Sequence, residues 1–200
     1  MTILLIDNYD SFTYNLYHLI ARVYDEEILV YRNDSITLDE IHEINPAFIV
    51  LSPGPGHPEV PRDFGICTQI ISNFGQFIPI LGVCLGHQGI GTVFGSTIKK
   101  AEMIYHGKTS QIHHNNSVLF EGIETPFVAM RYHSLVIDSE NYSDTIEITA
   151  STDTGEIMAI QHKKYPVHGI QFHPESFFTP NGEKLMSNFL KIRPVNSKKI

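Results

Sequence analysis

The hydrophobic and polar positions of residues 1–95 follow two alternating patterns. Short apolar runs bounded by turn residues predict four strands, at residues 2–6, 27–31, 47–51 and 78–83. The other stretches repeat apolar residues every three or four positions and predict helices, over residues 11–23, 37–44, 63–73 and 85–94. Strands that alternate with helices favour an α/β fold with a doubly wound, mostly parallel central sheet and flanking helices.

Local signals support these boundaries. Ser11 can cap the first helix, and Thr37 with Glu40 has the spacing of a capping box at the start of the second. The Pro- and Gly-rich residues 52–62 fit neither a helix nor a strand.

Residues 96–172 have a different pattern, with short β-rich runs and weak helical periodicity. These runs predict an additional, partly antiparallel strand region beside the main sheet, with strands near residues 127–132, 145–150, 156–161 and 167–172. Residues 180–192 then predict a closing helix, with Leu185, Met186, Phe189 and Leu190 facing inward. The chain shows no repeat or linker, so we expect one domain over residues 1–192 and a C-terminal tail over 193–200.

The composition is that of a soluble globular protein, with 42% hydrophobic and 18% charged residues. The formal charge of −8 at pH 7 argues against nucleic acid or an anionic membrane as a partner. No apolar run approaches the roughly 18 residues of a membrane helix, and the N-terminus lacks the basic start of a signal peptide. The 2 cysteines make no disulfide framework, so we expect a cytoplasmic protein with free thiols.

One cysteine lies between an apolar strand and a helix, at the centre of Gly-Val-Cys-Leu-Gly over residues 82–86. A strand, a tight turn with flanking glycines and a helix form a nucleophile elbow, here with Cys84 in the place of Ser. The elbow lifts the thiol to the carboxyl edge of the sheet and to a helix N-terminus, which favours the thiolate. The alternative is a buried core thiol, which is the role that the helical pattern indicates for Cys67.

The thiol needs a base, because a free thiol has a pKa of about 8.5 and is mostly protonated at pH 7. Among the 11 histidines, His173 has the most favourable context, in His-Pro-Glu at the end of an apolar run. Glu175 can orient the imidazole there. The alternative is an exposed histidine with an accidental acidic neighbour. His113 and His114 lack further ligands at metal-binding spacing, so we expect no metal site.

The third predicted strand is followed by Ser-Pro-Gly-Pro-Gly-His-Pro over residues 52–58. This loop should lie on the same rim of the sheet as the elbow. Its glycines leave backbone N–H groups open to an oxyanion, and the N–H of Leu85 at the elbow can supply a second donor. A rigid loop without a chemical role would have the same composition.

Taken together, residues 52–56, 82–88 and 173–175 resemble the motifs of the class I, triad-type glutamine amidotransferases. The resemblance implies that Cys84 is the nucleophile, His173 the general base and acid, and Glu175 the orienting carboxylate. It places the oxyanion on the backbone N–H groups of Gly56 and Leu85. It also implies a set of glutamine-binding residues, namely Gly54, Pro55, Gly56, Gln88, Ser134 and Leu135.

Within that family, residues 7–15, 106–108 and 131–136 resemble the small subunits of anthranilate synthase and aminodeoxychorismate synthase. The resemblance implies that L-glutamine is hydrolysed to glutamate through a cysteine thioester. The ammonia would pass to a chorismate-binding large subunit for anthranilate synthesis, or for aminodeoxychorismate synthesis, or for both. It implies no cofactor in this chain and Mg²⁺ in the partner subunit. His87 and residues 105–109 are candidate contacts with that partner.

Three other functions stay open at this point. A stand-alone cysteine hydrolase would use the same triad without a partner. A catalytically inactive scaffold subunit would be expected to lack a triad member, and all three are present. A third alternative is an amidotransferase with a different acceptor, such as a nucleotide synthetase.

Overall fold

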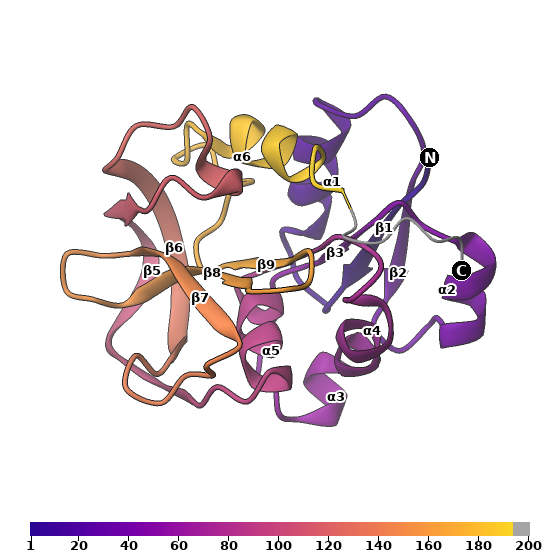
Figure 1. Cartoon of the computed structure of the whole chain (residues 1–200), viewed down its shortest axis with the longest axis horizontal. Coiled ribbons are helices and arrows are strands. Elements are labelled where there is room, and N and C mark those ends of the chain that lie inside the picture. The colour runs from indigo at the N-terminus through magenta and orange to yellow at the C-terminus, as the bar shows by residue number, and fades with distance from the viewer. Residues whose placement is uncertain (194–200) are drawn as a thin grey trace.

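The computed structural model describes residues 1–193, which form one nine-stranded mixed sheet with helices on both faces (Figure 1). The sheet order is β2-β1-β3-β4-β9-β8-β7-β5-β6. The predicted fold class is therefore confirmed. Of the predicted tail 193–200, all but Arg193 lies outside the described residues, and the division into domain and tail stays a prediction.

The first half of the sheet is parallel. Its strands are β1 Ile3–Asp7, β2 Ile28–Arg32, β3 Phe48–Leu51, β4 Ile80–Val83 and β9 Val167–Ile170. β1 pairs with both β2 and β3, and β4 pairs with both β3 and β9. Because these strands are parallel, the segments that follow them meet at one edge of the sheet, where open α/β sheets bind ligands.

The second half is antiparallel and lies at the other end of the molecule (Figure 1). Its strands are β5 Ile98–His114, β6 Phe127–Ile137, β7 Ile146–Ser151 and β8 Ile157–His162. A short 3-10 helix, η1 Val118–Phe120, lies between β5 and β6. An isolated bridge between Met130 and His173 joins β6 to the segment after β9. This contact brings the antiparallel strands to the ligand-binding edge of the parallel ones.

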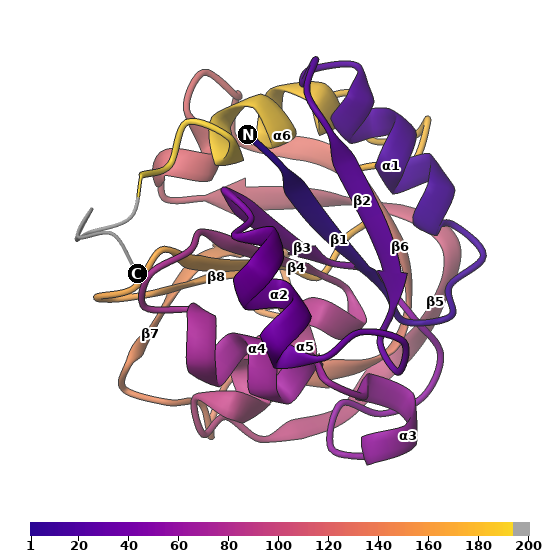
Figure 2. The same ribbon diagram turned by 90° about the vertical axis from the view of Figure 1, so that its right-hand side faces the viewer.

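Two layers of helices cover the sheet (Figure 2). The helices are α1 Thr13–Ala21, α2 Leu38–Ile44, α3 Pro61–Phe64, α4 Cys67–Phe74, α5 Leu85–Val93 and α6 Gly182–Phe189. Alternate residues of each central strand point to opposite faces. Those on one face pack against α1 and α6, and those on the other pack against α2, α4 and α5.

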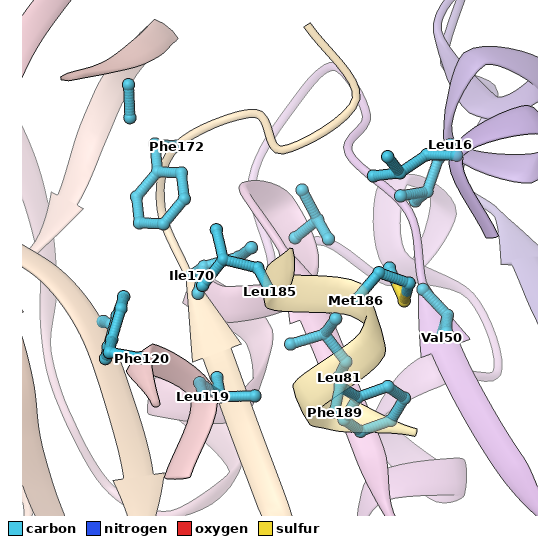
Figure 3. Close-up of a cluster of buried hydrophobic side chains, with 14 of the residues drawn as sticks. Leu16, Val50, Leu81, Leu119, Phe120, Ile170, Phe172, Leu185, Met186 and Phe189 are labelled. Carbon is cyan, nitrogen blue, oxygen red and sulfur yellow. The ribbon is translucent and has the colours of Figure 1, made fainter. Parts of the chain in front are cut away.

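The layer under α6 shows how the closing helix is held (Figure 3). Leu185, Met186 and Phe189 are buried against Val50 and Leu81 of the parallel strands. Leu190, also predicted to face inward, is only partly buried. Burial of each large side chain stabilises the fold by roughly 2 kcal/mol before the cost of ordering it.

Several predicted boundaries need correction. The helix predicted over residues 63–73 is two helices, broken at Gly65, whose φ is 51° and which packs against Asn33. α3 begins at Pro61, inside the stretch that was assigned to loop, because proline is favoured in the first turn of a helix. α1 begins at Thr13, after Phe12 and not after Ser11.

Other expectations agree with the structure. The Thr37 and Glu40 capping box is present, and Cys67 is fully buried in α4. The 17-residue strand β5 is a finding that the weak periodicity of residues 96–114 did not indicate. None of the helices formed by residues 1–193 is long and apolar enough to cross a membrane.

Candidate active site

Cys84 lies in the turn between β4 and α5, with a backbone φ of 52° and ψ of −100°. Such a positive φ is unusual for a residue with a side chain and stores strain. The flanking glycines make the turn possible, since a Cβ at position 86 would lie 2.6 Å from the carbonyl oxygen of Leu51. A Cβ at Gly82 would collide with the backbone of Gly86. The turn holds the thiol at the carboxyl end of β4 and at the N-terminus of α5.

The other two residues of the predicted triad follow β9. His173 Nδ1 and the Glu175 carboxylate are 2.6 Å apart, and both side chains are buried. The His173 backbone is fixed by its N–H, which donates to Met130 at 2.9 Å, and by its carbonyl, which accepts from Thr179 Oγ1 at 2.7 Å. With Nδ1 bound to the carboxylate, the buried Nε2 faces the Cys84 thiol, without ordinary hydrogen-bond geometry in this state. Catalytic hydrogen bonds often tighten only when substrate binds.

The charge state of His173 follows from these neighbours. Burial opposes a charged ring, but the Glu175 carboxylate and the Cys84 sulfur together hold the pKa of His173 well above its ordinary 6.5. At neutral pH the His173 ring is therefore favoured as an imidazolium, beside the Cys84 sulfur. That pair provides a nucleophile and an acid at one place.

A pocket of about 190 Å³ opens beside the sulfur. Its lining residues are Gly54, Pro55, Gly56, Cys84, Gln88, Tyr132, His133, Ser134 and Leu135. The structure thus brings together all six residues that the family resemblance implied for glutamine binding. Leu85 begins α5, so its N–H has no partner within the helix, as an oxyanion donor requires.

The loop that carries Gly54 and Gly56 is held by hydrogen bonds that the sequence did not predict. The Asn8 N–H donates to Ser52 Oγ, and the Asn8 side chain donates to the Ser52 carbonyl, both at 2.8 Å. Gly56 has a φ of 95°, and the next residue, His57, donates its N–H to Asp63 at 3.0 Å. These bonds fix the loop against the ends of β1 and β3.

The pocket wall formed by His133 and Leu135 is supported by the buried guanidinium of Arg131. Arg131 is 1% exposed and donates to Glu156 at 2.6 Å and to His133 Nε2 at 3.0 Å. Burial and the Arg131 charge lower the pKa of His133 to about 3, so its ring is neutral. Because Nε2 accepts from Arg131, Nδ1 carries the proton and donates to the Leu135 carbonyl at 3.1 Å. Arg131 was not predicted, since no sequence pattern marks an arginine for burial.

Other placements differ from expectation. His87 is fully buried against Gly169, so its assignment to a partner-contact surface is wrong. Burial lowers the pKa of His87 to about 3. Residues 106–109 are exposed. Phe12 lies inside the helix predicted over residues 11–23, but it precedes α1, is 39% exposed and stacks on Tyr132. Among residues 1–193, no group of three His, Cys, Asp or Glu side chains is arranged to hold a metal ion.

A cysteine at a nucleophile elbow, an imidazole and carboxylate after a neighbouring strand, and a shared pocket define a cysteine-dependent acyl-transfer site. The model of the family described as glutamine amidotransferase class-I matches residues 4–192. The chain therefore belongs to the class-I glutamine amidotransferases.

Two relatives of known name match this chain over nearly their full length. The chain is 50% identical over 189 residues to the aminodeoxychorismate/anthranilate synthase component 2 of Bacillus subtilis, covering 94% of this chain and 95% of that one. It is 53% identical over 189 residues to the anthranilate synthase component 2 of Cyanophora paradoxa, covering 94% and 97%. Other relatives are longer, and the chain spans 33% of a bifunctional one and 25% of a multifunctional one.

Solved structures support the fold. The chain superposes with a TM-score of 0.79 on a glutamine amidotransferase of Thermotoga maritima. The two are 14% identical, and the match covers 96% of this chain and 96% of that one. Identity this low supports the shared fold alone.

Proposed function

We propose that this chain is a glutaminase subunit that hydrolyses L-glutamine and delivers the ammonia to a chorismate-using synthase subunit for anthranilate synthesis. The observation that carries the proposal is the buried Cys84, His173 and Glu175 arrangement beside a pocket of about 190 Å³. The names of the two relatives that match over nearly their full length support the choice of synthase.

The chemistry follows from the site. The Cys84 thiolate attacks the side-chain amide carbon of glutamine, and the negative oxygen accepts from the N–H groups of Gly56 and Leu85. The His173 imidazolium gives its proton to the departing nitrogen, which leaves as ammonia. A γ-glutamyl thioester remains on Cys84.

In the second half of the reaction, hydrolysis of the thioester regenerates the free enzyme. Neutral His173 takes a proton from water, and the hydroxide attacks the thioester carbon on the same oxyanion donors. The Cys84 thiolate leaves, His173 stays protonated, and the new carboxylic acid loses its proton to water as glutamate is released. Every step uses side chains, backbone N–H groups and water, so the scheme assigns no cofactor to this chain and leaves Mg²⁺ to the synthase subunit.

A synthase partner follows from the fate of the product. Ammonia that escapes to water at neutral pH becomes ammonium, which is not a nucleophile, so direct transfer to an acceptor site is needed. Residues 106–109, which are exposed beside the pocket wall at Tyr132, are our candidate for the partner contact. We place the pair in the cytoplasm.

A second acceptor has specific support. The Bacillus subtilis relative is named for both aminodeoxychorismate and anthranilate synthesis. The same glutaminase chemistry would serve either synthase, because the acceptor never enters the pocket around Cys84.

The test is a reconstitution with candidate large subunits from the same organism. Complexes are assayed for anthranilate and aminodeoxychorismate from chorismate, with either glutamine or ammonium salts as the nitrogen source. We expect Cys84→Ser to abolish product formation from glutamine and to leave product formation from ammonia unchanged. The Cys67→Ser variant is the matched control and should keep both.

Other outcomes identify the alternatives. Glutamine-driven synthesis by the Cys84→Ser complex would refute the assignment of the nucleophile. Fast glutamine hydrolysis by the isolated chain, with no stimulation by any large subunit, would indicate a stand-alone hydrolase.

A further inference from the structure

Gln171 is a buried amide that no step above uses. It lies between the end of β9 and His173, is 0% exposed, and its backbone N–H donates to the Met158 carbonyl at 2.8 Å. Its side-chain nitrogen lies 3.6 Å from the Cys84 sulfur, and its side-chain oxygen lies 3.1 Å from Gln88 Nε2. The amide therefore joins the nucleophile to a residue of the glutamine pocket.

The surrounding bonds determine which way this amide points. The nitrogen and oxygen of an amide are assigned from their hydrogen bonds. Here the assignment can start from a group whose role is certain, the Leu135 carbonyl. The Leu135 carbonyl can only accept, so the Gln88 atom 2.9 Å from it must be the nitrogen. That nitrogen is a donor, so the Gln171 atom facing it must be the oxygen. The Gln171 nitrogen is therefore the atom that faces Cys84.

We propose that Gln171 is a positioning residue of the glutaminase site, whose N–H stabilises the Cys84 thiolate and whose oxygen holds Gln88 in its substrate-facing orientation. The proposal rests on the assignment of Cys84 as the nucleophile under the proposed function.

The first half of this role acts on the sulfur. A hydrogen bond to a charged acceptor is stronger than one to a neutral acceptor. The Gln171 N–H therefore favours the thiolate over both the thiol and the thioester sulfur. It assists formation of the attacking thiolate, and it assists its departure when water cleaves the thioester. His173 supplies the proton for ammonia, whereas Gln171 carries no charge and transfers no proton.

The second half acts on the substrate. Both N–H groups of Gln88 are occupied, one by Leu135 and the other by Gln171. The Gln88 oxygen is then the atom left to face the pocket, where it presents an acceptor to an N–H group of glutamine. Without the Gln171 oxygen, the Leu135 carbonyl alone holds the Gln88 amide, so the orientation of the Gln88 oxygen is less firmly fixed.

The experiment is alkylation of Cys84 by iodoacetamide across pH 5 to 10, in the wild-type chain and in Gln171→Leu and Gln171→Met. The Cys84→Ser variant measures the labelling of Cys67, and this background is subtracted. We expect the midpoint of the alkylation profile to move up by about one pH unit in both variants, since a hydrogen bond to a charged group contributes about a tenfold preference. We also expect KM for glutamine to rise several-fold, through Gln88.

The controls separate this role from packing. Gln161→Leu is the matched substitution, at an amide that donates to Glu147 at 2.7 Å, and should leave the profile unchanged. Gln171→Glu places a carboxylate beside the sulfur and should move the midpoint further than Gln171→Leu. Profiles of Gln171→Leu and Gln171→Met that coincide with the wild-type profile would overturn the inference. A wild-type Cys84 with no enhanced alkylation near pH 7 would instead overturn the proposed function.

A measurement on the wild-type chain covers the case in which the variants fail to fold. The side-chain amide resonance of Gln171 in a ¹⁵N-labelled chain should shift with pH at the same midpoint as alkylation. The shift should vanish in Cys84→Ser. A resonance that does not respond to pH in the wild-type chain would refute the hydrogen bond.

Discussion

The rings of Phe12 and Tyr132 are stacked with centroids 5.7 Å apart, although one precedes α1 and the other belongs to β6. Both rings also meet the His173 imidazole edge-on, with centroids 6.4 Å from His173 for Phe12 and 5.2 Å for Tyr132. The pair covers one side of the imidazole. Less water near the ring strengthens the attraction between the His173 imidazolium and Glu175.

We expect Phe12→Ala to lower kcat/KM for glutamine about 2- to 10-fold, because an aromatic pair contributes about 0.5–1.5 kcal/mol and its loss lets water reach His173. Steady-state glutaminase kinetics of the reconstituted complex measure the effect. Tyr14→Ala is the matched control, since Tyr14 is 64% exposed and packs on Tyr17 instead. Equal kinetics for Phe12→Ala and the wild type would show that the ring has no role in the site.

The pH dependence of the triad is set by Glu175. Its carboxylate is the main favourable influence on the raised pKa of His173. We expect Glu175→Gln to lower that pKa and to reduce glutaminase activity about 10²- to 10⁴-fold, the range for loss of acid–base function. The alkaline limb of the pH–rate profile should move to lower pH. Glu183→Gln, at an exposed ion pair with Arg22, is the control.

The raised pKa of His173 also determines whether the stability of the fold rises or falls with pH. A raised folded-state pKa contributes stability that is fully present below the unfolded value of about 6.5 and is lost as pH rises through the folded value. Wild-type stability from urea unfolding should therefore fall as the pH rises above neutral, and Glu175→Gln should lose less over the same interval. An unaltered pH dependence in the variant would contradict the assignment of Glu175.

The turn at Cys84 gives a steric prediction. A methyl group at position 86 would lie 2.6 Å from the Leu51 carbonyl oxygen, so Gly86→Ala should cost about 1–3 kcal/mol and displace the Leu85 N–H. Urea unfolding and glutaminase assays measure the two effects. Gly155→Ala is the control. Its φ of 82° would be strained for alanine, but no atom lies within 4 Å of a Cβ built there. It should lose stability by about 1 kcal/mol and keep full activity.

Local patterns predicted the parts of the site that depend on neighbours in the chain. The elbow glycines around Cys84 and the His173 and Glu175 pair are close in sequence, so spacing alone marked them. Ser134 and Leu135 were named only through the family resemblance. The periodicity of residues 11–23 includes Phe12 in the first predicted helix, whereas α1 starts one residue later and the Phe12 ring stacks on Tyr132, which lines the pocket.

Residues whose roles depend on distant segments gave no local signal. Gln171 reads as one more residue of a β-rich run, and only the meeting of β4 and β9 places it at the sulfur. The position of His87 one turn into the elbow helix makes it a candidate partner contact in the sequence. It is buried because Gly169 on β9 leaves room for its ring.

Arg131 is the clearest case of a role that only tertiary structure shows, and it gives the last prediction. Its guanidinium lies 3.3 Å from the centre of the Tyr105 ring and donates to Glu156 at 2.6 Å. We expect Arg131→Met to cost about 3 kcal/mol in urea unfolding, because the largely buried Glu156 carboxylate loses its partner. The KM for glutamine should rise, since His133 no longer has a fixed tautomer to hold Leu135.

The control for this prediction is Arg22→Met, at an ion pair whose side chains are 68% and 55% exposed. It should change stability by less than about 0.5 kcal/mol. A stable Arg131→Met chain with unchanged KM would show that the pocket wall does not depend on the buried cation.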